Sequence, residues 1–203
     1  FATAGGASIL PATQPVLTDA AGIATLASWT LGTATGPYTL TATSGSLTGS
    51  PVTFTATAVP GAACTVTSLI TPSAASVGAG GTVTITVQLR DANNNPLTAS
   101  GGNVTLSTTL GTLSSVADVG NGTYTATLST AGSGTATITG AINGSAIADN
   151  AVVTVNVGGA SAAQSTATVP AGTAGSITTV TIQARDALGN NLAAGGSAVL
   201  VTV

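Results

Sequence analysis

Apolar residues alternate with threonine and other polar residues in short runs along the whole chain. Residues 82–90 read TVTITVQLR, in which an apolar side chain occupies every second position. This period of two is typical of a half-buried β-strand, because successive side chains of a strand point to opposite faces. Comparable runs lie at 22–31, 51–58 and 122–130, with Gly, Pro or Asn-Gly turns between them. The pattern predicts an all-β protein made of short strands.

One stretch of the sequence occurs twice. Residues 82–97 read TVTITVQLRDANNNPL, and residues 177–192 read ITTVTIQARDALGNNL. The Arg-Asp-Ala triplets of the two copies begin at Arg90 and Arg185, which lie 95 positions apart. A fixed period of this length marks a tandem repeat, and it matches the size expected of a β-sandwich domain, about 100 residues. The sequence therefore predicts tandem β-sandwiches.

The repeat divides the chain into one complete domain and two partial ones. Residues 61–157 contain enough runs for a whole sandwich of about seven strands. Residues 1–60 correspond to the C-terminal half of such a domain, and residues 158–203 correspond to the N-terminal part of a further one. Half a sandwich leaves strand edges unpaired and half a core exposed. We therefore expect 158–203 to be completed by residues 1–60 of a neighbouring copy.

The two ends of the chain align with the same strand of the complete domain. Val201 falls opposite Leu106 by the repeat, and Phe1 also falls near Leu106. We therefore expect an assembly junction formed by Phe1, Val201 and Val203, at which copies join head to tail into a filament. One arrangement is a continuous tandem chain, which we favour because Val203 and Phe1 can be joined within a strand. The other is a set of separate subunits that share a domain by strand complementation.

Charged residues are nearly absent from the chain. It has two Arg and five Asp among 203 residues, and no Lys, Glu, His or Met. Catalysis needs a nucleophile or acid with an adjacent base, and the residue types that supply one are missing, so we expect no catalytic residue, no cofactor and no enzyme. Two cations and a net charge of −3 offer no surface for nucleic acid. No apolar run reaches the roughly 18 residues of a membrane-spanning helix.

The turn that follows Arg90 contains the candidate metal ligands. Asp91, Asn93 and Asn95 offer oxygen atoms in a spacing similar to the start of a calcium-binding loop, but the Gly and the distal bidentate acid of that loop are missing. The alternative, which we favour, is a turn whose Asp and Asn side chains bond to their own backbone.

Covalently attached glycans are a second candidate feature of the chain. Asn103, Asn121 and Asn143 each begin an Asn-x-Thr/Ser sequon, which makes them candidates for glycosylation in a host that has the machinery. Exposed Thr and Ser are equal candidates for O-linked sugar. Soluble monomers normally use charge to stay apart. A surface of Thr, Ser, Ala and Gly therefore fits a protein that assembles with identical copies or carries surface glycans.

Three stretches of the chain carry a family resemblance: 118–124 (DVGNGTY), the Arg-Asp-Ala turn, and 50–57 (SPVTFTAT). They resemble bacterial immunoglobulin-like repeats of the invasin/intimin (Big-1) type, and they are also similar to filamin-like repeats. The fold that this resemblance implies is a row of tandem immunoglobulin-like β-sandwiches. Tyr124 is similar to the corner tyrosine of immunoglobulin-like domains. The resemblance implies a stalk of a surface adhesin or another extracellular structure, and hence an extracellular or cell-surface location.

Our leading interpretation is a structural repeat segment of an extracellular filament or cell-surface stalk. The alternatives are an adhesin or carbohydrate-binding module, and a spacer in a large secreted enzyme. A sugar-binding face usually carries clustered aromatic side chains. All five aromatic residues of this chain instead fall at expected core positions: Phe1, Trp29, Tyr38, Phe54 and Tyr124.

Overall fold

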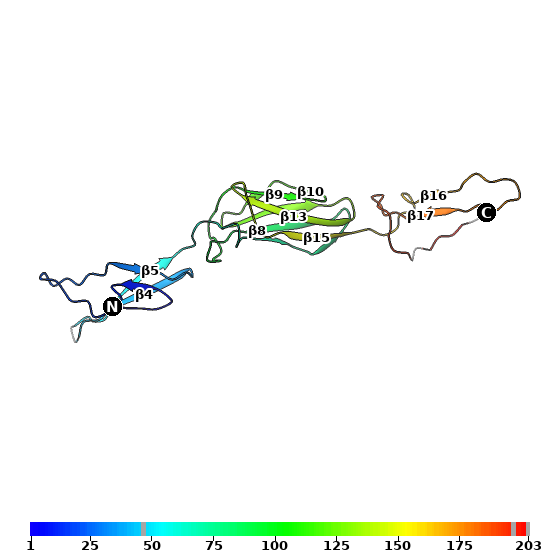
Figure 1. Ribbon diagram of the computed structural model, residues 1–203. Helices are drawn as coiled ribbons and strands as arrows, with labels where there is room; N and C mark the ends of the chain where they lie inside the picture. The colour runs from blue at the N-terminus through cyan, green and yellow to red at the C-terminus, as the bar shows by residue number, and fades with distance from the viewer. Residues whose placement is uncertain (46–47, 196–197, 202–203) are drawn as a thin grey trace.

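The computed structural model describes residues 1–45, 48–195 and 198–201. Three regions follow one another along an elongated molecule (Figure 1). We call 1–60 the N-terminal region, 61–157 the central region and 158–203 the C-terminal region. The described residues form strands and turns without any helix, so the all-β prediction is confirmed. In the same residues, accordingly, no helix is long and apolar enough to cross a membrane.

The central region is a sandwich of two five-stranded sheets. Its strands are β6 (Leu69–Pro72), β7 (Ser76–Gly78), β8 (Thr82–Gln88), β9 (Val104–Thr108), β10 (Thr112–Leu113), β11 (Ala117–Asp118), β12 (Thr123–Ser129), β13 (Gly134–Ile142), β14 (Ser145–Ala146) and β15 (Ala151–Asn156). One sheet has the order β10-β12-β8-β6, with β11 beside β12. The other has the order β14-β13-β15-β7, with β9 beside β13. The pairs are antiparallel except β15 with β7, which run parallel.

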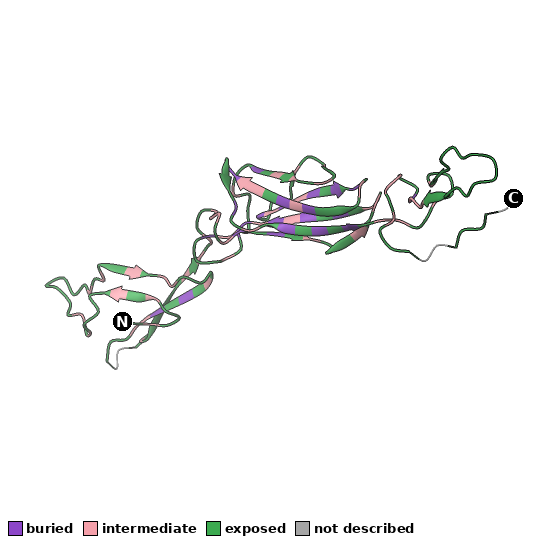
Figure 2. Cartoon of the chain, turned by 45° about the vertical axis from the view of Figure 1, so that its right-hand side comes forward, coloured by how far each residue is buried: buried purple, intermediate pink, exposed green. Residues whose placement is uncertain are grey.

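The hydrophobic core lies between these two sheets. In β8, Val83, Ile85 and Val87 are buried while Thr82 and Thr84 face outward, as the alternation predicts. β12 pairs with β8 along its whole length, and both strands bury alternate side chains (Figure 2). The core cluster consists of Ile70, Val83, Ile85, Val87, Leu89, Leu97, Val104, Tyr124, Leu128, Ala136, Ile138, Ile142, Ile147, Ala151 and Val153, with Leu106 partly buried against it. A core of small aliphatic side chains explains how the region folds with one aromatic ring.

The N-terminal region has two separate small sheets. Its strands are β1 (Ala2–Thr3), β2 (Ser8–Leu10), β3 (Ser28–Thr30), β4 (Gly36–Ala42) and β5 (Val52–Ala58). The order β1-β4-β5 forms one sheet, and β2 pairs with β3 in the other. Tyr38 and Leu40 are the buried apolar residues among its described positions. Phe54, which the alternation places at a core position, is 48% exposed, although its cross-strand partner Leu40 is buried.

The C-terminal region contains a single hairpin among its described residues. β16 (Thr166–Thr168) pairs with β17 (Thr181–Gln183). Ile182 and Val180 have the inward parity of the repeat, yet they are 38% and 47% exposed. Asp186 is the buried side chain of this region, and Figure 2 accordingly colours its described strands as exposed or intermediate.

Candidate assembly site

The strands of the two outer regions correspond to different halves of the central sandwich. By the repeat, β17 is equivalent to the C-terminal half of β8, and β16 to β6. In the N-terminal region, Ile9 pairs with Trp29 as Leu113 pairs with Leu128, so β2 and β3 are equivalent to β10 and β12. Among their described residues, these sheets of the two outer regions therefore correspond to different strands of the central sandwich.

The second sheet of the N-terminal region corresponds to the other half of the sandwich. β1, β4 and β5 have the order and the antiparallel pairing of β9, β13 and β15. Leu40 pairs with Phe54 as Ile138 pairs with Ala151. In the central region, β7 pairs with the edge of β15 that faces away from β13. Among the described residues, no strand pairs with the equivalent edge of β5, so that edge is open.

Apolar side chains of the C-terminal region are exposed at positions where their counterparts in the central region are buried. Ile182 and Val180 occupy the places of Val87 and Ile85, both of which are 0% exposed. Val199 is 56% exposed, whereas its counterpart Val104 is 5% exposed. Two adjacent hollows, which share Ile182 and Val199 in their linings, lie over the same segments. One, of about 470 Å³, is lined by residues that include Ile182 and Val199.

Phe1 and Val201, two of the residues expected at the assembly junction, belong to regions at opposite ends of the molecule. Phe1 is half-buried, and its amino group donates to Gln14 Oε1 at 2.9 Å. Val201 is 62% exposed, and Val203 lies outside the described residues. Figure 1 places the N- and C-termini far apart, so residues 1–60 and 158–203 do not close on each other within one chain.

The turn at 91–95 brings its three candidate metal ligands together through hydrogen bonds from nitrogen. Asp91 Oδ1 accepts the backbone N–H groups of Asn93 and Asn95, each at 2.9 Å. The Asn95 side chain donates to both carboxylate oxygens, at 3.1 and 2.9 Å. Both oxygens of Asp91 are thus already engaged by donors, which is the geometry of the Asx turn. Within the residues that the structure describes, no group of three or more His, Cys, Asp or Glu could hold a metal ion.

The carboxyl of Asp91 is held in its charged form by these donors. The Asn95 side chain, and next the N–H of Gly61, lower the pKa of Asp91 from 3.8 to about 2. At the equivalent position in the repeat, the Asn190 side chain and the N–H of Gly158 lower the pKa of Asp186 in the same way, to about 2. Hydrogen bonds to a carboxylate favour its ionised form, which outweighs the cost of burial.

The three sequon asparagines are all exposed, but their side chains differ in what they bind. Asn121 Oδ1 accepts the N–H of Thr123 at 3.1 Å. Asn143, at φ 49°, lies in the turn between β13 and β14, and its Oδ1 accepts the N–H of Asn103 at 2.8 Å. Two of the sequons are therefore joined by a hydrogen bond. All three remain candidates for glycosylation.

Tyr124 ties a distant loop to the core of the central region. Its ring is 3% exposed, and its hydroxyl donates to Gly102 O at 2.8 Å and accepts the N–H of Gly101 at 3.1 Å. A corner tyrosine bonds to backbone a few residues upstream. Tyr124 instead reaches the loop that leads into β9, so the similarity lies in the bond type and not in the segment it closes.

Comparison with known proteins identifies the central region. Residues 64–158 match the family model for invasin, domain 3. These residues form an immunoglobulin-like repeat of the bacterial adhesin type. Invasin itself, described as a bacterial integrin-binding protein, has a solved structure that is 27% identical, with a TM-score of 0.55. The match covers 94% of this chain and 39% of invasin.

Two further adhesin structures are similar. FdeC, an adhesin of Escherichia coli, is 26% identical over 93% of this chain and 62% of its own, with a TM-score of 0.56. The Yersinia pseudotuberculosis adhesin InvE is 28% identical over 63% of this chain and 36% of its own, with a TM-score of 0.50. The chain thus spans less than two thirds of each of these relatives. No curated protein sequence matches it.

These relatives confirm the predicted immunoglobulin-like adhesin repeat and the predicted extracellular or cell-surface location. They are adhesins and not enzymes. The sequence analysis did not predict that Asp91 and Asn95 also bind residues outside their own turn, at Gly61 and Thr33. A signal was present, because Asp91 and Asn95 recur as Asp186 and Asn190 with the same spacing.

Proposed function

We propose that this chain is a structural segment of an extracellular filament or cell-surface stalk, in which 158–203 of one copy and 1–60 of the next complete one sandwich. The observation that carries the proposal is the order of the small sheets. Joined edge to edge, β2-β3 and β17-β16 give the order β2-β3-β17-β16. This is the order of β10-β12-β8-β6 in the central region.

The same correspondence supplies the missing neighbour of β5. In the central region, β7 runs parallel to β15 and covers its edge. Residues 171–173 are the equivalents of β7 by the repeat. In an assembled filament they pair with β5 of the next copy, and Phe1 then lies next to the segment that contains Val201. An unpaired strand edge is a template for such pairing between chains.

Burial of the exposed apolar faces supplies the driving force. Val180, Ile182 and Val199 of one copy would enter the same core as Phe54 and Val52 of the next, all of which are 38% to 56% exposed in the single chain. Full burial of a Val, Ile or Phe side chain contributes about 1.5–3 kcal/mol. The small number of charges leaves little repulsion between copies to oppose this contact.

The distribution of aromatic residues favours a stalk over a sugar-binding module. Tyr38 and Tyr124 are buried, and Phe1 and Trp29 are partly buried. Phe54 is the one exposed aromatic side chain, and it belongs to the proposed shared core. No cluster of exposed rings is therefore left to form a sugar-binding face.

The single tryptophan provides the test. Trp29 lies in β3, and its counterpart Leu128 pairs with Val83, so in the proposed sandwich it would face Thr178, just before β17, of the preceding copy. As the protein concentration rises, we expect its fluorescence to shift to shorter wavelength while light scattering reports growing head-to-tail oligomers. Ile182→Asp places a charge in the shared core and should abolish both changes, because an unpaired buried charge is costly.

The matched control is Val66→Asp, which changes a residue that is 74% exposed on the central region and should leave assembly intact. A chain that stays monomeric at every concentration, with an unchanged Trp29 spectrum, would contradict the proposal. A denaturing gel of native filaments separates the two arrangements. A ladder or a very large species indicates one continuous chain, and a single band at the mass of 203 residues indicates separate subunits.

A further inference from the structure

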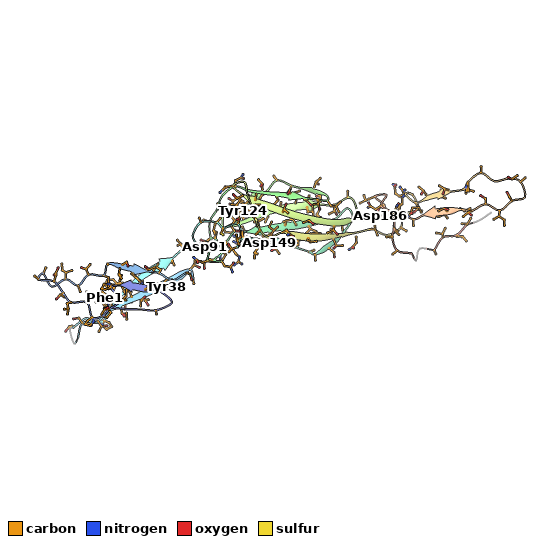
Figure 3. The ribbon with its side chains drawn as sticks, viewed as in Figure 1. Phe1, Tyr38, Asp91, Tyr124, Asp149 and Asp186 are labelled. Atoms are coloured by element: carbon orange, nitrogen blue, oxygen red, sulfur yellow. The ribbon has the colours of Figure 1, made fainter. Side chains whose placement is uncertain are left out.

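The molecule has two necks, which are the junctions of the central region with the N-terminal region and with the C-terminal region. The two necks are built from equivalent loops of the repeat. Figure 3 shows Asp91 and Asp186 at the two ends of the central region, each next to the segment that leads to a neighbouring region. Both aspartate residues are almost fully buried, with 3% and 1% exposure. A buried charge is costly unless hydrogen bonds compensate it. Two buried carboxylates among the five of the chain, at equivalent places, therefore call for a structural reason.

At both necks the carboxylate binds the linker that enters its region. Asp91 Oδ2 accepts the N–H of Gly61 at 2.9 Å, and Asp186 Oδ2 accepts the N–H of Gly158 at 3.0 Å. The linker is bound a second time a few residues further on. The N–H of Cys64 donates to Arg90 O at 2.7 Å, and the N–H of Ser161 donates to Arg185 O, also at 2.7 Å.

The asparagine of the same loop reaches across to the preceding region. Asn95 Nδ2 donates to Thr33 O at 2.8 Å, and its Oδ1 accepts the N–H of Thr35 at 3.3 Å. At the second neck, Asn190 Nδ2 donates to Ala131 O at 3.1 Å. The same Nδ2 group of each asparagine also donates to its aspartate, at 2.9 Å to Oδ2.

At each neck, one carboxylate thus connects three segments. It binds its own turn and the linker directly, and it binds the asparagine that reaches a loop of the preceding region. A linker alone allows the two regions to rotate about it. A second contact point, displaced from the linker, removes that freedom. Charge strengthens the arrangement, because hydrogen bonds to an ionised acceptor are about twice as strong as neutral ones.

We propose that each Asp-x-x-x-Asn loop is a junction latch that fixes the angle and twist between consecutive regions. The first latch consists of Asp91 and Asn95, and the second consists of Asp186 and Asn190. This inference rests on contacts within one chain, so it does not depend on the shared sandwich. In any array of such repeats, a latch at every neck makes the stalk stiff with one constant geometry.

The test measures a distance across the first neck in the full chain. Spin labels at Thr55→Cys and Thr84→Cys, in a Cys64→Ser background, sit on exposed positions of β5 and β8. Labelled chains are diluted in unlabelled ones so that each pair is measured within one copy. We expect a single narrow distance peak for the parent chain. Asn95→Ala, which removes the bridge to Thr33 and Thr35, should replace it with a broad distribution.

The control is Asn93→Ala in the same turn. Asn93 is exposed, and only its backbone N–H binds Asp91, which alanine retains. This variant should keep the narrow peak. Asp91→Ala should lose it, but that change also removes the acceptor of its own turn, so the decision rests on Asn95→Ala with the thermal unfolding of the central region unchanged. A narrow peak in Asn95→Ala, or a broad one in the parent chain, would overturn the latch.

Discussion

β17 has nearly the same sequence as the C-terminal half of β8, but the two strands lie in different surroundings. In β8, Ile85 and Val87 are completely buried between two sheets. Their counterparts in the C-terminal region, Val180 and Ile182, are 47% and 38% exposed. The alternation of side chains is the same in both places because it follows from backbone geometry. Burial differs because β8 has β12, β6 and a covering sheet, whereas β17 has β16 alone.

The N-terminal region makes the same point with the other half of the sandwich. β4 buries Tyr38 and Leu40, but Phe54 on the neighbouring β5 is half exposed. A local pattern therefore determines which face is apolar, and only the partner strands determine whether that face is protected from water. Substitutions at equivalent positions of different regions separate these two contributions.

The largest contrast is expected for Val87→Ala against Ile182→Ala. Val87→Ala leaves a cavity in a closed core and should destabilise the central region by about 1.5–5 kcal/mol. Ile182→Ala should cost less than about 1 kcal/mol in dilute single chains, since its side chain is already 38% exposed there. Denaturant unfolding of the full chain, followed by circular dichroism, measures both. Equal costs would mean that the C-terminal region already has a closed core of its own.

An intermediate contrast is expected for the two buried tyrosines. Tyr124→Phe removes a hydroxyl that both donates to Gly102 and accepts from Gly101, and it should cost about 1–3 kcal/mol. Tyr38→Phe removes one bond, to Ala34 O, and should cost about 0.5–1.5 kcal/mol.

Circular dichroism reports the unfolding of the central region, and Trp29 fluorescence reports that of the N-terminal region. If Tyr38→Phe proves the more damaging, the N-terminal region depends on its loop contacts more than its small core suggests.

The smallest effect is expected when the pH is lowered. The pKa values of Asp91 and Asp186 are lowered from 3.8 to about 2, so their contribution is complete above pH 3.8 and is lost as the pH falls through about 2. The spin-label distance across the first neck should therefore broaden between these limits. Asp91→Asn should be broad already at neutral pH, whereas Asp118→Asn, in a turn away from the neck, should follow the parent. A parent peak that stays narrow below pH 2 would show that the charge of Asp91 is not needed.

Much of the central fold follows from the sequence because it depends on local pattern. The inward positions of β8 and β12 were predicted from alternation, and the Asn143-Gly144 turn marks the hairpin between β13 and β14. The two-residue strands β10, β11 and β14 were not predicted, because pairing over two residues depends on where neighbouring strands lie. For the same reason, the alternation at Phe54 predicts its face but not its exposure.

The candidate site was predictable only in part. The repeat indicates which strands each outer region has, and therefore where a partner would fit. The bonds of Asp91 to Gly61, and of Asn95 to Thr33, join segments 30 and 62 positions apart and leave no local pattern. The turn itself was predicted, since an Asp side chain that binds the backbone two residues on is a property of the short segment.

Each latch loop is directly preceded by one of the two arginines of a chain that has no lysine. Trypsin-like proteases cut after these two residue types, so they find two peptide bonds in 203 residues, at Arg90 and Arg185. Each arginine has its Nε atom buried, and each bond enters a turn held by the adjacent aspartate. Proteolysis needs a segment that can open into the active site of the protease. We therefore expect trypsin to cut the folded chain slowly at these two bonds, and faster at the first of them in Asp91→Ala.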